Sequence, residues 1–165
     1  MSLRVRIIGT GLIGTSLGIA LSRRGHAVTL ADPSPTALAL ARDLGAGTLA
    51  TAGSEAPEVV VVAAPPDVTG VVVAEELRRW PEAVVTDVAS VKVAVLRDAE
   101  AAGADLSRYA GSHPMAGRER SGAVAARGDL FDGRAWVVVP NEKSSELPTA
   151  TELYQTTYRS WPSGL

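Results

Sequence analysis

The sequence has no cysteine, only two methionines and few aromatic residues, which make up 4% of its 165 residues. The lack of cysteine excludes a disulfide scaffold, a thiolate metal site and cysteine nucleophile chemistry, and we expect no metal site. The formal net charge of −2 argues against a dedicated binder of nucleic acids or anionic membranes. With 46% apolar and 21% charged residues the chain is not a disordered tail, and its length fits one folded domain.

One apolar stretch, residues 7–21, superficially resembles the core of a secretory signal peptide because Arg4 and Arg6 precede it. Four glycines interrupt the stretch and disfavour the helix that such a peptide needs. Arg23 and Arg24 follow directly where a cleavage site should lead into the mature chain. Since no longer apolar run occurs, we predict no membrane span and expect a cytoplasmic protein.

Short apolar runs alternate with helix-length segments, a pattern typical of an α/β protein with a Rossmann-type, doubly wound and mainly parallel sheet. Ser34 and Pro35 indicate a helix start, and Gly45 indicates its end. We predict strands at 3–8, 27–31, 58–64, 83–87, 109–111 and 134–139, and helices at 15–24, 34–44, 67–79, 90–102 and 119–127. This domain spans residues 1–142, and apolar spacing in the tail 143–165 predicts one amphipathic helix packed on it.

The first strand leads into a G-x-G-x-x-G motif that opens a helix, the pattern of a dinucleotide-binding turn. In this motif the first glycine allows a tight turn, the second lets backbone amides approach a pyrophosphate, and the third lets helix and strand pack closely. The predicted cofactor contacts in this turn are Gly9, Thr10, Gly11, Leu12, Ile13 and Gly14.

Asp32 lies 18 residues after Gly14, at the end of the second predicted strand. A carboxylate there can accept hydrogen bonds from the adenosine ribose hydroxyls and would repel a 2′-phosphate, so we predict NAD rather than NADP. The simpler interpretation is that Asp32 only starts the Asp-Pro-Ser-Pro turn.

Three loops leave predicted strands at the edge where ligands bind in such a sheet. Ala64 and Pro65 lie in the first loop, Ser90 in the second and His113 in the third. Histidine is the side chain best suited to move protons near neutral pH, whereas a locally bonded loop histidine is the alternative. We expect His26, the other histidine, to lie on the surface at the opposite edge. Ser90 could simply cap the following helix.

Four blocks in order resemble the prephenate/arogenate dehydrogenase family: G-T-G-L-I-G-T-S-L from Gly9, D-V-A-S-V-K from Asp87, G-S-H-P-M-A-G-R-E-R-S-G from Gly111, and L-F-D-G-R from Leu130. The resemblance implies an NAD-dependent prephenate dehydrogenase of tyrosine biosynthesis, which decarboxylates prephenate oxidatively to 4-hydroxyphenylpyruvate. It implies that His113 accepts the proton of the substrate ring hydroxyl and that Ser90 lies beside this histidine and the nicotinamide. Ala64 and Pro65 are expected at the cofactor. Glu119 matches an acidic residue near the site entrance, although it could be a solvated charge.

Members of this family continue into an all-helical domain that supplies the dimer interface and much of the substrate pocket, and this sequence has no counterpart to it. We therefore expect a truncated or fragmentary chain that is a monomer or weak oligomer, with a small-molecule substrate, prephenate or arogenate, and no nucleic-acid or membrane partner. Loss of contacts to the remote part of the substrate should lower rate as well as affinity. The alternatives are an arogenate dehydrogenase, a stand-alone NAD-binding module without activity, and a different Rossmann reductase.

Overall fold

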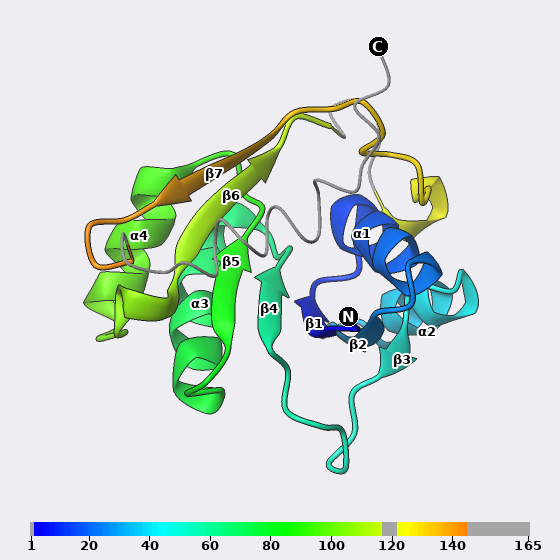
Figure 1. Cartoon of the computed structure of the whole chain (residues 1–165), viewed down its shortest axis with the longest axis horizontal. Coiled ribbons are helices and arrows are strands. Elements are labelled where there is room, and N and C mark those ends of the chain that lie inside the picture. Colours follow the sequence, from blue (N-terminus) through cyan, green and yellow to red (C-terminus); the bar gives the residue numbers. More distant parts are fainter. Residues whose placement is uncertain (1, 117–121, 145–165) are drawn as a thin grey trace.

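A five-stranded parallel sheet forms the centre of the protein (Figure 1). The computed structural model describes residues 2–116 and 122–144. The strand order is β3-β2-β1-β4-β5, with β1 at the centre, as in a doubly wound fold. The strands are β1 (Arg4–Ile8), β2 (Ala27–Ala31), β3 (Thr48–Leu49), β4 (Val59–Val62) and β5 (Val84–Asp87). The predicted fold class is confirmed, and the two-residue strand β3 was not predicted.

Four helices cover the two faces of the sheet, a pair on each face (Figure 1). They are α1 (Leu12–Arg23), α2 (Pro35–Asp43), α3 (Pro66–Arg79) and α4 (Lys92–Ala101). Alternate β1 side chains face opposite cores, so that Ile7 packs with α1 and α2 whereas Ile8 packs toward α3 and α4. No helix within the described ranges combines the length and apolar composition needed to cross a membrane.

One predicted helix start agrees with the structure, and two others differ from it. The Ser34 hydroxyl accepts a hydrogen bond from the Ala37 N–H at 3.3 Å, which confirms the predicted cap of α2. By contrast, α3 begins at Pro66, one residue before its predicted start, and α4 begins at Lys92, so Ser90 does not cap it. Pro66 lies in the first turn of α3, a position that suits proline, and no described side chain caps either helix.

A second, two-stranded antiparallel sheet lies beside β5. It consists of β6 (Ala110–Pro114) and β7 (Trp136–Pro140). The prediction that His113 follows a strand is therefore wrong: His113 pairs with Val137 inside β6. Glycine and proline in this segment concealed the strand, which pairs with the valine-rich β7 despite its own low propensity.

Two short 3₁₀ turns, η1 (Leu106–Arg108) and η2 (Ala123–Ala125), complete the described elements. Only η2 occupies the described part of the predicted helix 119–127, because Gly122 precedes it with a positive φ of 83°. The predicted tail helix lies outside the described residues, and the domain boundary at residue 142 stays a prediction.

Close packing of α1 generates a stability prediction. A Cβ added at Gly18 would lie 2.4 Å from the Ala46 carbonyl oxygen, so Gly18→Ala should destabilise the fold by about 1–3 kcal/mol despite alanine's better helix propensity. Urea unfolding measures this. Gly53→Ala is the matched control, since its Cβ would meet no atom within 4 Å, and its effect should stay within about 0.5 kcal/mol. Equal effects of the two substitutions would contradict the packing argument.

Candidate functional site

Strand register places the ligand-facing loops at one level of the sheet. Ile8 of β1 pairs with Ala31 on one side and with Val62 on the other, and Val62 pairs in turn with Asp87. The residues that follow these four therefore leave the sheet side by side. This is the carboxyl edge where open α/β sheets bind ligands.

The first and third glycines of the glycine-rich turn lie against backbone atoms and leave no room for a side chain. Gly9 has a φ of 94°, and a Cβ there would lie 2.4 Å from the Ala63 carbonyl oxygen. A Cβ at Gly14 would lie 2.0 Å from the Gly9 carbonyl oxygen. Gly11 differs, since its Cβ position has no atom within 4 Å. Two glycines thus serve packing, and the middle one leaves its backbone open to a ligand.

Helix α1 presents an uncapped N-terminus at this open position. Gly11 is its N-cap, no described side chain caps the helix, and its first turn has no acidic residue. The first N–H groups of a helix have no intrahelical partners, and the helix dipole favours negative charge beside them. The turn therefore fits the pyrophosphate of a dinucleotide.

Asp32 is held by three donors. Its Oδ2 accepts hydrogen bonds from the Thr10 N–H at 2.6 Å and the Thr10 hydroxyl at 2.9 Å, while Oδ1 accepts from the Ser34 N–H at 2.8 Å. The turn role considered above is thus real, and it leaves acceptor capacity on Oδ1, because each carboxylate oxygen can accept about two hydrogen bonds. Asp32 can hold the turn and still bind a hydroxyl group.

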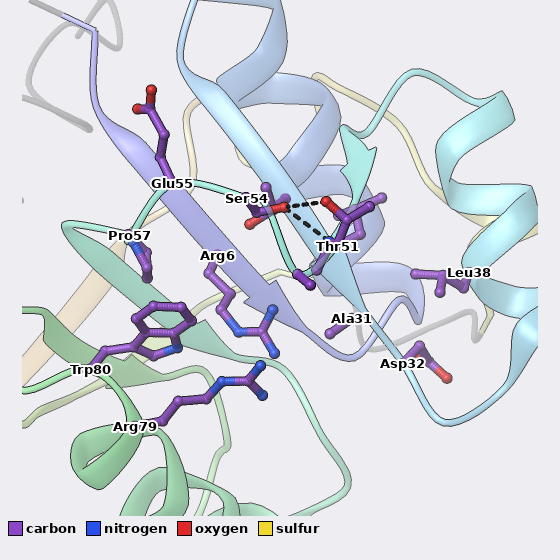
Figure 2. A pocket seen from close by; sticks show the side chains of 14 residues that line it. Arg6, Ala31, Asp32, Leu38, Thr51, Ser54, Glu55, Pro57, Arg79 and Trp80 are labelled. Carbon is purple, nitrogen blue, oxygen red and sulfur yellow. Dashed lines mark hydrogen bonds between the residues drawn. The ribbon is translucent and has the colours of Figure 1, made fainter.

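A pocket of about 490 Å³ extends from Asp32 across β1 and β2 (Figure 2). Arg6, Arg79 and Trp80 lie together at the end away from Asp32. Glu76 accepts hydrogen bonds from Arg6 Nε and from Trp80 Nε1, each at 2.9 Å, so the buried Arg6 charge is paired. This ion pair was not predicted from the sequence, although an arginine that alternates with apolar residues in β1 is a signal for it.

The predicted site residues outside the glycine-rich turn and Asp32 differ in their location and exposure. Ser90 is exposed in the β5–α4 loop, and Ala64 and Pro65 lie in the β4–α3 loop. His113 is half-buried in β6, and its Nδ1 is buried without a hydrogen-bond partner among the described residues. Glu119 lies outside the described residues. A buried nitrogen without a hydrogen-bond partner costs free energy of folding, so a partner from outside the described residues, such as a ligand, would stabilise the His113 ring.

His26 is half-buried rather than on the surface, because its Nδ1 accepts a hydrogen bond from the Leu3 N–H at 3.1 Å. Burial lowers the pKa of His26, and the positive charges of the N-terminus and Arg24 lower it further. It precedes β2, at the opposite edge of the sheet from the glycine-rich turn. His26 is therefore no competitor for the role of His113.

A buried polar network centred on Asp87 lies next to Ser90 and His113. Asp87 is 0% exposed, pairs with the Lys92 ammonium and accepts a hydrogen bond from the Tyr109 hydroxyl at 2.7 Å. Burial lowers the pKa of Lys92, an effect that Asp87 opposes, and burial together with the Asp87 charge raises the pKa of Tyr109 well above its usual value. Tyr109 thus remains a hydrogen-bond donor. The sequence analysis did not single out Asp87 or Lys92, although both lie in the D-V-A-S-V-K block.

Comparisons with known proteins show the family to which the chain belongs. The family model described as the nucleotide-binding domain of prephenate dehydrogenase matches residues 17–157, which is most of the chain. The chain belongs to the prephenate dehydrogenase family. The match starts after the glycine-rich turn, whose chemistry rests on the geometry described above.

Individual members of the prephenate dehydrogenase family are also similar. The probable prephenate dehydrogenase NovF of Streptomyces niveus is 49% identical over 137 residues, 81% of this chain and 37% of NovF. The A. aeolicus prephenate dehydrogenase, solved with hydroxyphenyl propionate and NAD+, is 27% identical with a TM-score of 0.80 and covers 96% of this chain. The Synechocystis arogenate dehydrogenase is 26% identical with a TM-score of 0.79 over the same share. This chain spans 57% of each solved chain, and thus only part of these relatives.

The donors around Asp32 generate a prediction that needs no ligand. Asp32→Ala in this prephenate dehydrogenase family member leaves the buried Thr10 N–H without its acceptor, which should cost about 1–3 kcal/mol in the free energy of unfolding. Urea unfolding followed by circular dichroism measures it. Asp43→Ala removes a carboxylate whose only ion pair among the described residues is with its exposed neighbour Arg42, and it should change stability by less than about 1 kcal/mol. A loss no larger than that of the control would show that Asp32 does not hold the turn.

Proposed function

We propose that this chain binds NAD and supplies the cofactor-binding and proton-accepting part of a prephenate dehydrogenase. The observation that carries the proposal is the common strand register, which brings the glycine-rich turn, Asp32 and the loop of Ser90 to one edge. Family membership supports the same activity. The chain spans 37% of NovF, so the remaining contacts to substrate belong to parts that these relatives have in addition.

In this proposal the chain holds the two ends of NAD in different ways. The backbone from Gly9 to Gly14 and the N-terminus of α1 bind the pyrophosphate, while Asp32 accepts a hydrogen bond from an adenosine ribose hydroxyl through Oδ1. The Asp32 carboxylate disfavours a 2′-phosphate, and neither Pro33 nor Ser34 offers a cation to offset that repulsion. Ala64, Pro65 and Ser90 contact the cofactor farther along the edge.

His113 accepts the proton of the substrate ring hydroxyl, and Ser90 contacts the substrate beside it. NAD supplies the hydride acceptor when bound. The ring becomes aromatic when the carbon that bears the hydroxyl loses its hydride and the ring carboxylate leaves as carbon dioxide, with the electrons of the broken carbon–carbon bond remaining in the ring. Aromatisation provides the driving force, so the protein chiefly has to orient the substrate and accept one proton. Glu119 is proposed at the substrate entrance on the family resemblance alone.

Arogenate is the second candidate substrate. The Synechocystis arogenate dehydrogenase matches with nearly the same TM-score as the A. aeolicus prephenate dehydrogenase, 0.79 against 0.80. The two substrates share the ring that becomes aromatic and differ in the side chain on the ring carbon opposite the hydroxyl, so the same proton acceptor serves both. We also propose a cytoplasmic location, where the NAD pool used by biosynthetic enzymes is found. The expected monomer or weak oligomer stays a prediction.

Cofactor choice gives the first functional test. Asp32→Arg removes the hydroxyl acceptor and places a cation at the ribose, so NAD affinity should fall about tenfold or more while NADP affinity rises. Titration of each dinucleotide by fluorescence measures both. Asp43→Arg is the control, since Asp43 lies at the exposed end of α2 and should leave both affinities unchanged. Unchanged NAD affinity in Asp32→Arg would remove Asp32 from this role.

Proton transfer gives the second test. His113→Asn should lower turnover roughly 10²–10⁴-fold, because the amide cannot accept the hydroxyl proton, and should leave NAD affinity unchanged. NADH formation with prephenate and with arogenate measures turnover, and His26→Asn at the far edge is the control. Full activity in His113→Asn would exclude His113 as the base. A wild-type chain that binds NAD but oxidises neither substrate would favour the NAD-binding module or a fragment disabled by the missing substrate contacts.

A further inference from the structure

The strand that carries His113 has almost no backbone pairing with the main sheet. Between β5 and β6 there is a single backbone bridge, which pairs Val85 with Tyr109. In the described structure β6 pairs in a ladder only with β7. Backbone pairing with the main sheet therefore ends four residues before His113 and does not fix that residue relative to the cofactor edge.

Side chains replace the missing ladder, and they converge on Asp87. The Tyr109 hydroxyl donates to Asp87 Oδ2 and the Ser112 hydroxyl donates to the Asp87 carbonyl oxygen, both at 2.7 Å. Lys92 Nζ pairs with the Asp87 carboxylate and also donates to the Ser112 carbonyl oxygen at 2.7 Å. The Ser112 peptide, which leads directly into His113, is thus held from two sides.

The same carboxylate holds the loop that carries Ser90. Asp87 Oδ1 accepts a hydrogen bond from the Ala89 N–H at 2.9 Å, and its ion pair with Lys92 fixes the other end of this short loop. Ser90 lies between these two attachment points. One buried carboxylate therefore connects the two residues proposed to act on the substrate.

The packing around Gly111 shows how closely the network fits. A Cβ on Gly111 would lie 2.9 Å from Lys92 Cδ, 3.1 Å from the Tyr109 hydroxyl oxygen and 3.3 Å from Asp87 Oδ2. Gly111 lies in an ordinary strand and is not among the glycines with positive φ in the described chain. Glycine is needed at this position for space, because the Lys92 stem and the Asp87 carboxylate occupy the place of a side chain.

We propose that Asp87 is the positioning residue for Ser90 and His113, with Lys92 as its counter-ion. The roles of Ser90 and His113 rest on the proposed function, whereas the link between them does not. A buried ion pair adds little net stability compared with apolar residues, but its hydrogen bonds require defined geometry at both ends. Here Asp87 and Lys92 flank the loop of Ser90, and Lys92 also donates to the Ser112 carbonyl oxygen, directly before His113 in β6. Misplacement of a reacting group by about 1 Å can cost on the order of a hundredfold in rate.

The test compares Asp87→Asn, Lys92→Met and the double variant. Asp87→Asn leaves the half-buried Lys92 ammonium without its counter-ion, so this variant should unfold at a lower urea concentration than wild type. Removing that ammonium in the double variant should restore much of the lost stability. Position should not recover in the same way, because the neutral pair no longer connects β5 to the Ser112 carbonyl. In the double variant the free energy of unfolding should therefore recover, whereas the position of His113 should not.

Alignment is read from the imidazole NMR signals, since the chain has only two histidines, His113 and His26. The His113 signals should be displaced in Asp87→Asn and in the double variant, and the His26 signals should stay in place. Glu76→Gln is the matched control: it breaks another buried ion pair, with Arg6, and should lower stability without moving His113. In turnover assays kcat should fall about tenfold or more in both Asp87 variants, with the KM for NAD within about twofold of wild type.

The outcomes separate the proposals. If the His113 signals and kcat recover together with stability in the double variant, or never change, Asp87 has a structural role only and the inference is wrong. If wild-type protein neither binds NAD nor forms NADH, the proposed function is wrong, while the His113 signals still decide whether Asp87 sets the position of that ring.

Discussion

The alignment of Ala31, Ile8, Val62 and Asp87 in one row across four parallel strands is the constraint on which the rest of the site depends. Backbone hydrogen bonds extend this row by one step, from the Gly9 N–H to the Ala31 carbonyl and from the Ala63 N–H to the Ile8 carbonyl. The glycine-rich turn and the Asp32 carboxylate begin at the next residue, and the buried network is centred on Asp87 within the row itself. A slip of one residue in any strand would turn its side chains to the opposite face and separate these groups.

The sequence predicted the features that depend on neighbours along the chain. The glycine spacing and the Ser34 cap involve short-range geometry, and the valine run marked β4 because both of its faces are buried. The same reasoning gave four of the five parallel strands. It missed β3, since a strand of two residues carries too little pattern to distinguish it from a loop.

Features that depend on distant residues could not be predicted in this way. Asp87 is bonded to Tyr109 and Ser112, which lie 22 and 25 residues away, and Arg6 is paired with Glu76 at a separation of 70. Lys92 has the sequence pattern of a solvated helix residue, and only the tertiary fold turns its ammonium toward Asp87. β6 was underestimated for the same reason, because its partner β7 lies beyond a long connection and its own residues favour turns.

At Gly9 and Gly14 the atoms that pack the sheet edge are also the atoms that shape the cradle for a phosphate group. A side chain at either position would push apart β1, β4 and α1 before it ever met a ligand. A screen for loss of binding and a screen for loss of folded protein would therefore select the same substitutions at these two positions. At Gly11, where the space above the backbone is open, the two screens would give different answers. Protein abundance in cells would thus detect harmful substitutions at Gly9 and Gly14, but it would not detect a loss of binding at Gly11.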